Sequence, residues 1–253
     1  MFRSFLRPAR PIAALVVAVG LAGCGAPGPD VSQAINDPYE AQNRKIHAFN
    51  KNRDRQILRP VAVAYSDTMP DDVEIVVSNV SDNLSLPGQV VNNLLQGDLR
   101  MASSNTLRFL INSTAGFAGM FDPSSELGLP KDDTDFGETL HVWGVGEGHY
   151  QELPFVGPST QRDTTGMVVD FVLDPTRAIL PRVDRNIATG VRIVDGVGAR
   201  GRFSETVDSI LYDSADSYAQ ARLLYLQNRR FELGMAAPAE EEIDPFALDT
   251  EGF

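Results

Sequence analysis

Three histidines and one cysteine are the residues best suited to chemistry in this chain of 253 residues. A Ser–His–Asp hydrolase would need His47, His141 or His149 beside a serine on a sharp G-x-S-x-G turn. The nearest serine turn, Gly157-Pro158-Ser159-Thr160-Gln161, lacks that spacing, and His47 is expected in a helix with a surface or packing role. The histidines show no HxH or HxxxH spacing, and one cysteine forms neither an intramolecular disulfide nor a zinc site. The sequence therefore predicts no catalytic residue, no metal ligand and no enzyme.

Four acidic side chains, Asp132, Asp133, Asp135 and Glu138, lie close together in the sequence. They do not fit the calcium loop D-x-[DN]-x-[DN]-G, because Gly137 stands where the third ligand should be. The simpler interpretation is that Asp135 and Glu138 cap the helix that they begin.

A literal G-x-G-x-x-G occurs at Gly196-Val197-Gly198-Ala199-Arg200-Gly201. A dinucleotide site would need a second strand ending in an acid about 20 residues further on. Here that stretch, Ser209 to Ser217, continues into a helix, so we favour a flexible helix–helix connection and predict no cofactor. The chain also lacks a G-x-x-x-x-G-K-[ST] motif for ATP, and its net charge of -12 disfavours nucleic acid as a partner.

The cysteine has a different context. Residues 1–23 have Arg3, Arg7 and Arg10 before an apolar run, and Leu21-Ala22-Gly23 leads into Cys24. This pattern is typical of a secretory signal and resembles a bacterial lipoprotein signal. That resemblance implies cleavage before Cys24 and acylation of Cys24 as the lipid anchor. In lipoproteins of this kind an aspartate directly after the cysteine usually marks retention in the inner membrane, so the resemblance, with Gly25 at that position, implies the outer membrane.

The elements that follow are mainly helical. Residues 24–36 are expected to form a tether, and Asp37-Pro38-Tyr39-Glu40 to open a helix as a capping box, running to about Gln56 before Arg59-Pro60 stops it. Further helices are expected at 73–84, from Pro87 to Gly97, at 99–116 and at 214–233. Their inward faces are predicted from the spacing of Val73, Val76, Val77, Val80 and Leu84, of Leu99, Ala102, Leu107, Leu110 and Ile111, and of Tyr218, Ala221, Leu224 and Tyr225. Residues 235–253 contain acids and no base, which predicts a disordered acidic tail.

Residues 116–163 are rich in glycine and proline, and only one short helix, at Phe136 to Trp143, is expected there. A long loop of this kind inside a compact domain is usually functional. Its apolar run Gly116–Phe121 leaves two interpretations open, a buried turn and a segment that contacts lipid.

An ordered series of blocks through residues 37–234 resembles the MlaA/VacJ phospholipid-transport lipoproteins. In chain order the blocks are Asp37-Pro38-Tyr39-Glu40, Asn43-Arg44, Phe49-Asn50, Arg59-Pro60-Val61-Ala62-Val63-Ala64, Leu95-Gln96-Gly97-Asp98, Arg108-Phe109-Leu110-Ile111-Asn112, Asp135-Phe136-Gly137-Glu138-Thr139-Leu140, Val142-Trp143-Gly144-Val145-Gly146, Tyr150, Leu153-Pro154-Phe155, Gly157-Pro158-Ser159-Thr160, Arg162-Asp163 and the helix Tyr218 to Arg229.

The resemblance implies a single ring-shaped helical domain on the periplasmic face of the outer membrane. It also implies a central passage, of lining residues unknown from the sequence, through which mislocalised outer-leaflet phospholipid moves inward. The implied partners are phospholipid, outer-membrane porin trimers and a soluble periplasmic lipid carrier. Two other functions stay open at this point: a periplasmic lipoprotein hydrolase that acts on phospholipid or cell wall, and a lipoprotein that only braces outer-membrane assemblies.

Overall fold

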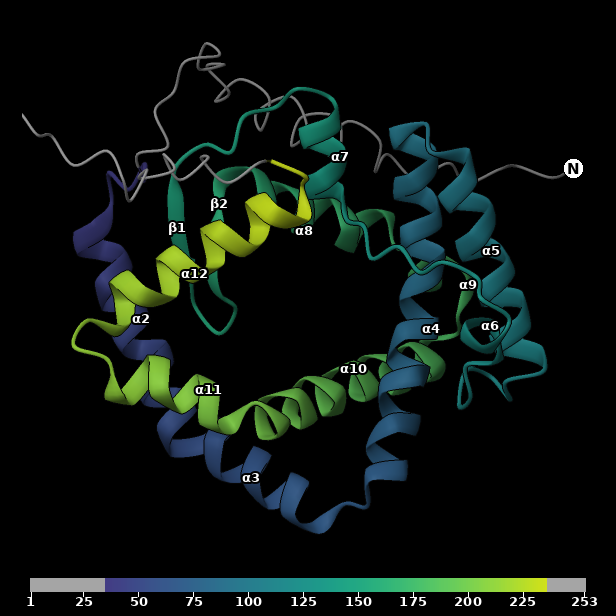
Figure 1. Ribbon diagram of the computed structural model, residues 1–253, viewed down its shortest axis with the longest axis horizontal. Helices are drawn as coiled ribbons and strands as arrows, with labels where there is room; N and C mark the ends of the chain where they lie inside the picture. Colours follow the sequence, from purple (N-terminus) through teal and green to yellow (C-terminus); the bar gives the residue numbers. More distant parts are fainter. Residues whose placement is uncertain (1–34, 236–253) are drawn as a thin grey trace, which may run out of the picture. The chain divides into compact units, whose positions relative to one another are not determined.

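The computed structural model describes residues 35–235 (Figure 1). Cys24, nearly all of the expected tether and the acidic tail lie outside the described residues. The chain divides after Ser204 into two compact units, which are taken here one at a time. The prediction of a mainly α-helical protein is confirmed.

The first unit contains most of the elements. They are α2 (Glu40–Arg53), the π-helical turn η1 (Asp54–Leu58), α3 (Arg59–Thr68), α4 (Asp71–Gln96), α5 (Leu99–Thr114), α6 (Pro123–Glu126), α7 (Phe136–Val142), β1 (Tyr150–Leu153), β2 (Gly157–Thr160), α8 (Gln161–Leu173), α9 (Pro175–Ile179) and α10 (Arg182–Arg202).

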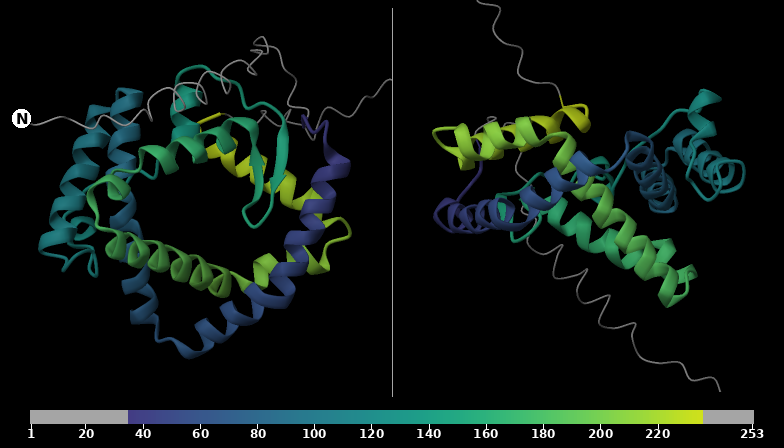
Figure 2. Two further views of the ribbon diagram at one scale, coloured as in Figure 1. Left: turned by 180° about the vertical axis from the view of Figure 1, so that it is seen from behind. Right: turned by 90° about the horizontal axis from the view of Figure 1, so that it is seen from below.

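The elements of the first unit form a closed series, in which each element packs against the next and the last connects back to the first. Helix α2 packs on β1, β1 pairs with β2, β2 contacts α8, and α8 packs on α7. Helix α7 packs on α4, α4 on α10, and α10 on α3, which η1 joins back to α2. Figures 1 and 2 show this closed circuit of elements within the first unit.

The predicted start and end of the first helix are wrong. Helix α2 begins at Glu40 without a side-chain cap, because Asp37 Oδ1 accepts instead from Asn43 Nδ2 at 2.9 Å. Pro60 does not stop the helical path either. A proline removes one helical hydrogen bond and crowds the carbonyl four residues before it, and the wider η1 turn relieves both effects. The same turn carries Asp54, whose carboxylate receives two hydrogen bonds of 2.8 Å from buried Arg200 of α10.

Helix α4 is one continuous helix, not the two predicted on either side of Pro87. A proline inside a helix costs roughly 3 kcal/mol. Helices α5, α7, α9 and α10 all pack on α4, and their contacts outweigh that cost.

The predicted inward faces of α4 and α5 are also wrong in part. Val73 and Leu99, expected inside, are 42% and 67% exposed, and Leu107 and Leu110 are exposed as well. Of the predicted α5 face, only Ala102 is buried. The buried positions of the two helices are mostly polar: Glu74, Ser81, Asn83, Asn92, Asn93, Ser104, Asn105, Arg108 and Asn112. In α5 the apolar spacing therefore marks mostly the outer surface, whereas in α4 Val76, Val77, Val80 and Leu84 are half-buried and only Val73 is exposed.

The glycine- and proline-rich region is more ordered than expected. It contains α6, α7 and an antiparallel hairpin in which Tyr150 pairs with Thr160 and Leu153 with Gly157. The hairpin is not predicted from the sequence, because each strand has only four residues and β2 contains a proline. The helix predicted at Phe136 to Trp143 is present as α7, with Asp135 as its cap.

Apart from Ser204, the second unit contains α11 (Ser204–Asp208), together with the π-helical turn η2 (Ser209–Asp213) and α12 (Ser217–Glu232). Helix α12 packs on η2, and Asp216 caps it by accepting from Ala219 N at 3.1 Å. Tyr218 is buried as predicted, whereas Leu224 is 42% exposed and Leu226 is buried in its place.

Candidate functional site

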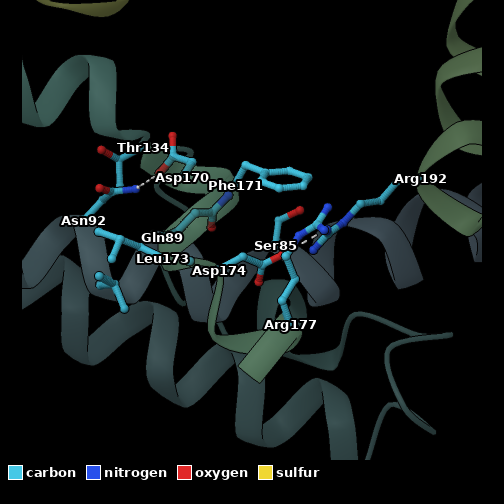
Figure 3. Close-up of a pocket in the computed structure, with 12 residues that line it drawn as sticks. Ser85, Gln89, Asn92, Thr134, Asp170, Phe171, Leu173, Asp174, Arg177 and Arg192 are labelled. Atoms are coloured by element: carbon cyan, nitrogen blue, oxygen red, sulfur yellow. Dashed lines mark hydrogen bonds and ion pairs between the residues drawn. The ribbon is translucent and has the colours of Figure 1, made fainter. Parts of the chain in front are cut away.

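A pocket of about 310 Å³ lies in the first unit where α4, α8, α9 and α10 meet (Figure 3). Helix α4 supplies one wall through Ser85, Gln89 and Asn92, and Thr134 comes from the segment before α7. The charged side chains of the pocket come from the end of α8 and from α9 and α10: Asp170, Asp174, Arg177 and Arg192. This pocket is the candidate site.

One end of the pocket carries two guanidinium groups around a single carboxylate. Arg192 Nη1 lies 3.4 Å and Arg177 Nε 3.5 Å from Asp174 Oδ2. Arg192 Nη2 also donates to Leu84 O at 2.8 Å, which fixes the guanidinium against α4. The guanidinium of Arg177 stacks on Phe171, with its carbon 3.7 Å from the ring centroid. Both arginine distances exceed the about 2.7–2.9 Å of a strong charge-assisted hydrogen bond.

The main hydrogen bonds of Asp174 are with α9 and not with the two arginines. It caps α9, accepting from the amide of Thr176 at 2.9 Å and from its hydroxyl at 2.6 Å. Burial alone would raise the pKa of Asp174, but these two hydrogen bonds and Arg192 lower it below its ordinary value. The carboxylate thus keeps its charge, while Arg192 Nε is left without a hydrogen-bond partner among the described residues.

The other end of the pocket is acidic. Asp170 accepts from Asn92 Nδ2 at 2.9 Å and from the amide of Phe136 at 3.0 Å. Asn92 is held in turn by Thr139, whose hydroxyl lies 3.1 Å from Asn92 Oδ1. Burial raises the pKa of Asp170, and the two hydrogen bonds only partly oppose this.

Apolar side chains flank the charged groups. Val91, Phe171 and Leu173 line the pocket, and the outer surface of α8 continues with exposed Met167, Val168 and Val172. A charged recess beside an exposed apolar strip suits a ligand that has both a polar and an apolar part.

The three histidines lie in different elements. His47 of α2 is buried, with Nδ1 3.2 Å from Glu152 Oε1, and Tyr150 donates to the second oxygen of that carboxylate at 2.6 Å. His141 Nδ1 lies 3.4 Å from Arg162, and the ring of His149 packs edge-on against Tyr39. His47 therefore has the predicted packing role, at a buried position.

The clustered acidic residues Asp132, Asp133 and Asp135 each interact with a different partner. Asp132 accepts from Asn93, Asp133 lies 3.2 Å from Lys131, and Asp135 caps α7 by accepting from Glu138 N at 2.8 Å. Among residues 35–235 no group of three or more His, Cys, Asp or Glu side chains is arranged to hold a metal ion.

The G-x-G-x-x-G motif lies inside α10, so the expectation of a flexible connection is wrong. Its glycines let α10 approach α3. A Cβ at Gly198 would lie 3.1 Å from the Tyr65 ring, and one at Gly201 would collide with Ser66 and with the carbonyl of Ala62.

The apolar run Gly116–Phe121 is not a buried turn. Phe117 is 70% exposed, and Phe117, Ala118 and Gly119 all have positive φ. The strained backbone leads into Asp122, which receives 2.7 Å and 2.8 Å hydrogen bonds from Arg108 and Asn112. The interpretation that remains is a segment whose rings face the surroundings of the protein.

Helix α2 holds the tip of the hairpin. Asn50 donates to Leu153 O at 2.9 Å and accepts from the amide of Phe155 at 2.8 Å. Phe49 packs edge-on against Phe155, with ring centroids 5.2 Å apart. Phe155 is a non-glycine residue with a φ of 65°, so these contacts stabilise a strained turn.

The pocket residues are not predicted as a site from the sequence. One signal was available, since Asp174-Pro175 is a typical helix start with a cap and a proline at the first position. Nothing in the spacing could bring Arg192 to Asp174, because 18 residues and the start of another helix separate them.

The fold and the pocket define a helical protein with polar packed faces, apolar outer faces and a charged recess. The family model described as "MlaA lipoprotein" matches residues 35–232. The chain therefore belongs to the MlaA lipoprotein family.

Relatives and a solved structure agree with this assignment. The "Intermembrane phospholipid transport system lipoprotein MlaA" of Shigella flexneri is 35% identical over 83% of both chains. The protein of the same name from Haemophilus influenzae is 32% identical over 88% of this chain and 89% of its own. A chain of solved structure, described as "Structural basis for maintenance of bacterial outer membrane lipid asymmetry", has a TM-score of 0.65 and 33% identity. It covers 78% of this chain and 98% of its own length.

Within the described part of the chain, no helix combines the length and the apolar character needed to cross a membrane.

Proposed function

We propose that this protein is an outer-membrane lipoprotein that takes mislocalised phospholipid from the outer leaflet and passes it to a soluble periplasmic carrier. In this role it maintains the lipid asymmetry of the outer membrane. Membership of the MlaA family and the phospholipid-transport names of the relatives support the proposal. Association with outer-membrane porin trimers is part of the same proposal.

The observation that carries the proposal is the reversed burial of the helices. In the described residues, buried polar and charged side chains outnumber buried apolar ones, and many large apolar side chains are exposed. In water, exposed apolar area costs about 25 cal/mol per Å². Acyl chains around the outer faces would remove that cost. This reversed arrangement supports a protein whose outer faces contact lipid.

Transfer of this kind needs no nucleophile. Each CH₂ of an acyl chain brought into water costs about 0.8 kcal/mol, so a conduit works by shielding the chains while the headgroup stays hydrated. The protein supplies a path, and lipid moves down a gradient or to a carrier that another system empties. We therefore propose that the protein is not an enzyme.

Reconstitution tests both statements. The full-length protein is placed in vesicles that contain a fluorescent phospholipid, and transfer to albumin as a soluble acceptor is followed without nucleotide. We expect faster transfer of chemically intact lipid than from vesicles without protein. Release of lysophospholipid or fatty acid that stops in a His47→Ala/His141→Ala/His149→Ala variant would instead establish the hydrolase. Absence of any transfer would contradict the proposal.

A further inference from the structure

The pocket between α4, α8 and α10 contains two polar atoms that are buried and unsatisfied, one a donor and one an acceptor. Arg192 Nε and Gln89 Oε1 have no hydrogen-bond partner among the described residues. A buried polar group left unpaired costs about 1–3 kcal/mol, so such groups usually indicate a missing ligand or water. Both residues line the same pocket, and Figure 3 shows Gln89 between the acidic and cationic ends.

The donor lies at the cationic end. Arg192 Nε has no hydrogen-bond partner among the described residues. Arg177 Nε lies 3.5 Å from Asp174, whose shorter hydrogen bonds are with Thr176. Two guanidinium groups that converge in this way suit a phosphate group, which accepts several N–H donors at once. The acceptor lies toward the acidic end. Gln89 donates to Asp133 at 3.0 Å, which leaves its carbonyl oxygen available beside the pocket.

We propose that this pocket binds the headgroup of a zwitterionic phospholipid that carries a primary amine. The phosphodiester lies against Arg177 and Arg192. The ammonium group donates to Gln89 Oε1 and faces the carboxylate of Asp170. The proposal rests on the proposed function, since it names the lipid that the transport path selects.

Charge balance favours a zwitterion over an anionic lipid. The pocket has two guanidinium groups and two carboxylates, and they lie at opposite ends apart from Asp174. A headgroup with separated positive and negative charges complements both ends. A headgroup with phosphate alone would leave Gln89 Oε1 unsatisfied and bring a net negative charge near Asp170. The pocket volume of about 310 Å³ falls at the lower end of the about 300–1,000 Å³ that is common for small-ligand sites.

The acyl chains have an exit. Phe171 and Leu173 line the pocket and are 59% and 48% exposed, and Val172 between them is also exposed. Chains attached to a bound headgroup would lie along this outer strip of α8, where apolar area is otherwise uncovered.

Calorimetric titration of the full-length protein in detergent tests the proposal. The probes are dihexanoyl phosphatidylethanolamine, dihexanoyl phosphatidylglycerol, dihexanoylglycerol and inorganic phosphate. We expect phosphatidylethanolamine to bind at least tenfold more tightly than the other three. Inorganic phosphate binding as tightly would indicate an anion site and overturn the proposal.

Three variants and one control assign the contacts. Arg177→Gln and the Arg177→Gln/Arg192→Gln pair should weaken phosphatidylethanolamine binding at least tenfold, and Gln89→Leu should abolish its preference over phosphatidylglycerol. Arg182→Gln, which removes the same charge from an exposed position of α10, should bind like the unmodified protein. Arg177→Gln keeps the test valid if the double variant fails to fold, because Arg177 is partly exposed.

Two different failures can be told apart. If the unmodified protein transfers lipid between vesicle and acceptor but the arginine variants bind phosphatidylethanolamine equally well, the headgroup site is wrong and the transport function stands. If the unmodified protein transfers no lipid, the transport function itself is wrong.

Discussion

At the scale of single residues, Asp122 shows how this protein stabilises charge inside a polar interior. Burial alone would raise the pKa of Asp122, but hydrogen bonds from Ser124, Ser125 and Asn112 and the Arg108 guanidinium hold it well below the ordinary value of 3.8. A carboxyl with a lowered folded-state pKa contributes stability that is present above its ordinary pKa. That stability is lost as the pH falls toward the folded-state pKa.

We therefore expect Asp122→Asn to destabilise the protein at neutral pH by about 1–3 kcal/mol, because buried donors lose their acceptor. Below about pH 4 the difference from the unmodified protein should shrink. Thermal unfolding at pH 7 and pH 3.5 measures both effects, with exposed Asp71→Asn as the control. A difference that stays constant with pH would contradict this account of Asp122.

The polar residues of the pocket illustrate what a sequence reveals about single positions. Asp135 was predicted as a cap and is one, because a cap depends only on its own next three residues. Arg192 and Asp170 were not predicted, because their roles depend on how α4, α8 and α10 meet. Local chemistry is visible in the sequence, whereas contacts between distant segments are not.

At the scale of elements, the existence of helices was predictable and their orientation was not. The apolar period of Val73, Val76 and Val80 correctly indicates a helix at α4. The assumption that an apolar stripe faces the core holds for proteins in water. It is wrong for most of the α5 face and for Val73 of α4, and several asparagines and serines of the two helices are buried instead.

Close backbone contact between α7 and α8 gives the first prediction at this scale. A Cβ at Gly166 of α8 would lie 2.7 Å from Gly137 Cα, and even closer to its backbone nitrogen. Gly166→Val should therefore separate the two helices and lower the unfolding temperature by several degrees. Gly190→Val is the matched control, because nothing lies within 4 Å of a Cβ there. Equal effects of the two substitutions would show that the contact is not limiting.

The second prediction at the scale of elements concerns helix α2. Deleting Ala48 and Phe49 rotates the helix on one side of the deletion by about 200° relative to the other. His47 then cannot keep its contact with Glu152 while Asn50 keeps its contact with Phe155. We propose that α2 and the hairpin control lipid movement, in which case the deletion should release that control and leak lipid outward.

The leak should be dominant. Cells that carry both the deletion and the intact protein should show raised outer-leaflet phospholipid, whereas Phe49→Ala should have a weaker effect. A recessive loss identical to removal of the gene would count against control by α2.

At the scale of the whole molecule, the predicted lipid anchor lies outside the described residues. The signal pattern predicts Cys24 as the acylated residue, and two or more acyl chains make membrane attachment stable. We expect Cys24→Ser to give an uncleaved or soluble periplasmic form in cell fractionation. Normal outer-membrane fractionation of this variant would contradict the prediction.

The function proposed for this protein is the removal of phospholipid from the outer leaflet of the outer membrane. The most direct measurement is labelling of outer-leaflet phospholipid on intact cells with and without the gene, and with the gene restored. We expect raised labelling in cells that lack the gene and a return to normal on restoration of the unmodified protein. Equal labelling in all three strains would contradict it.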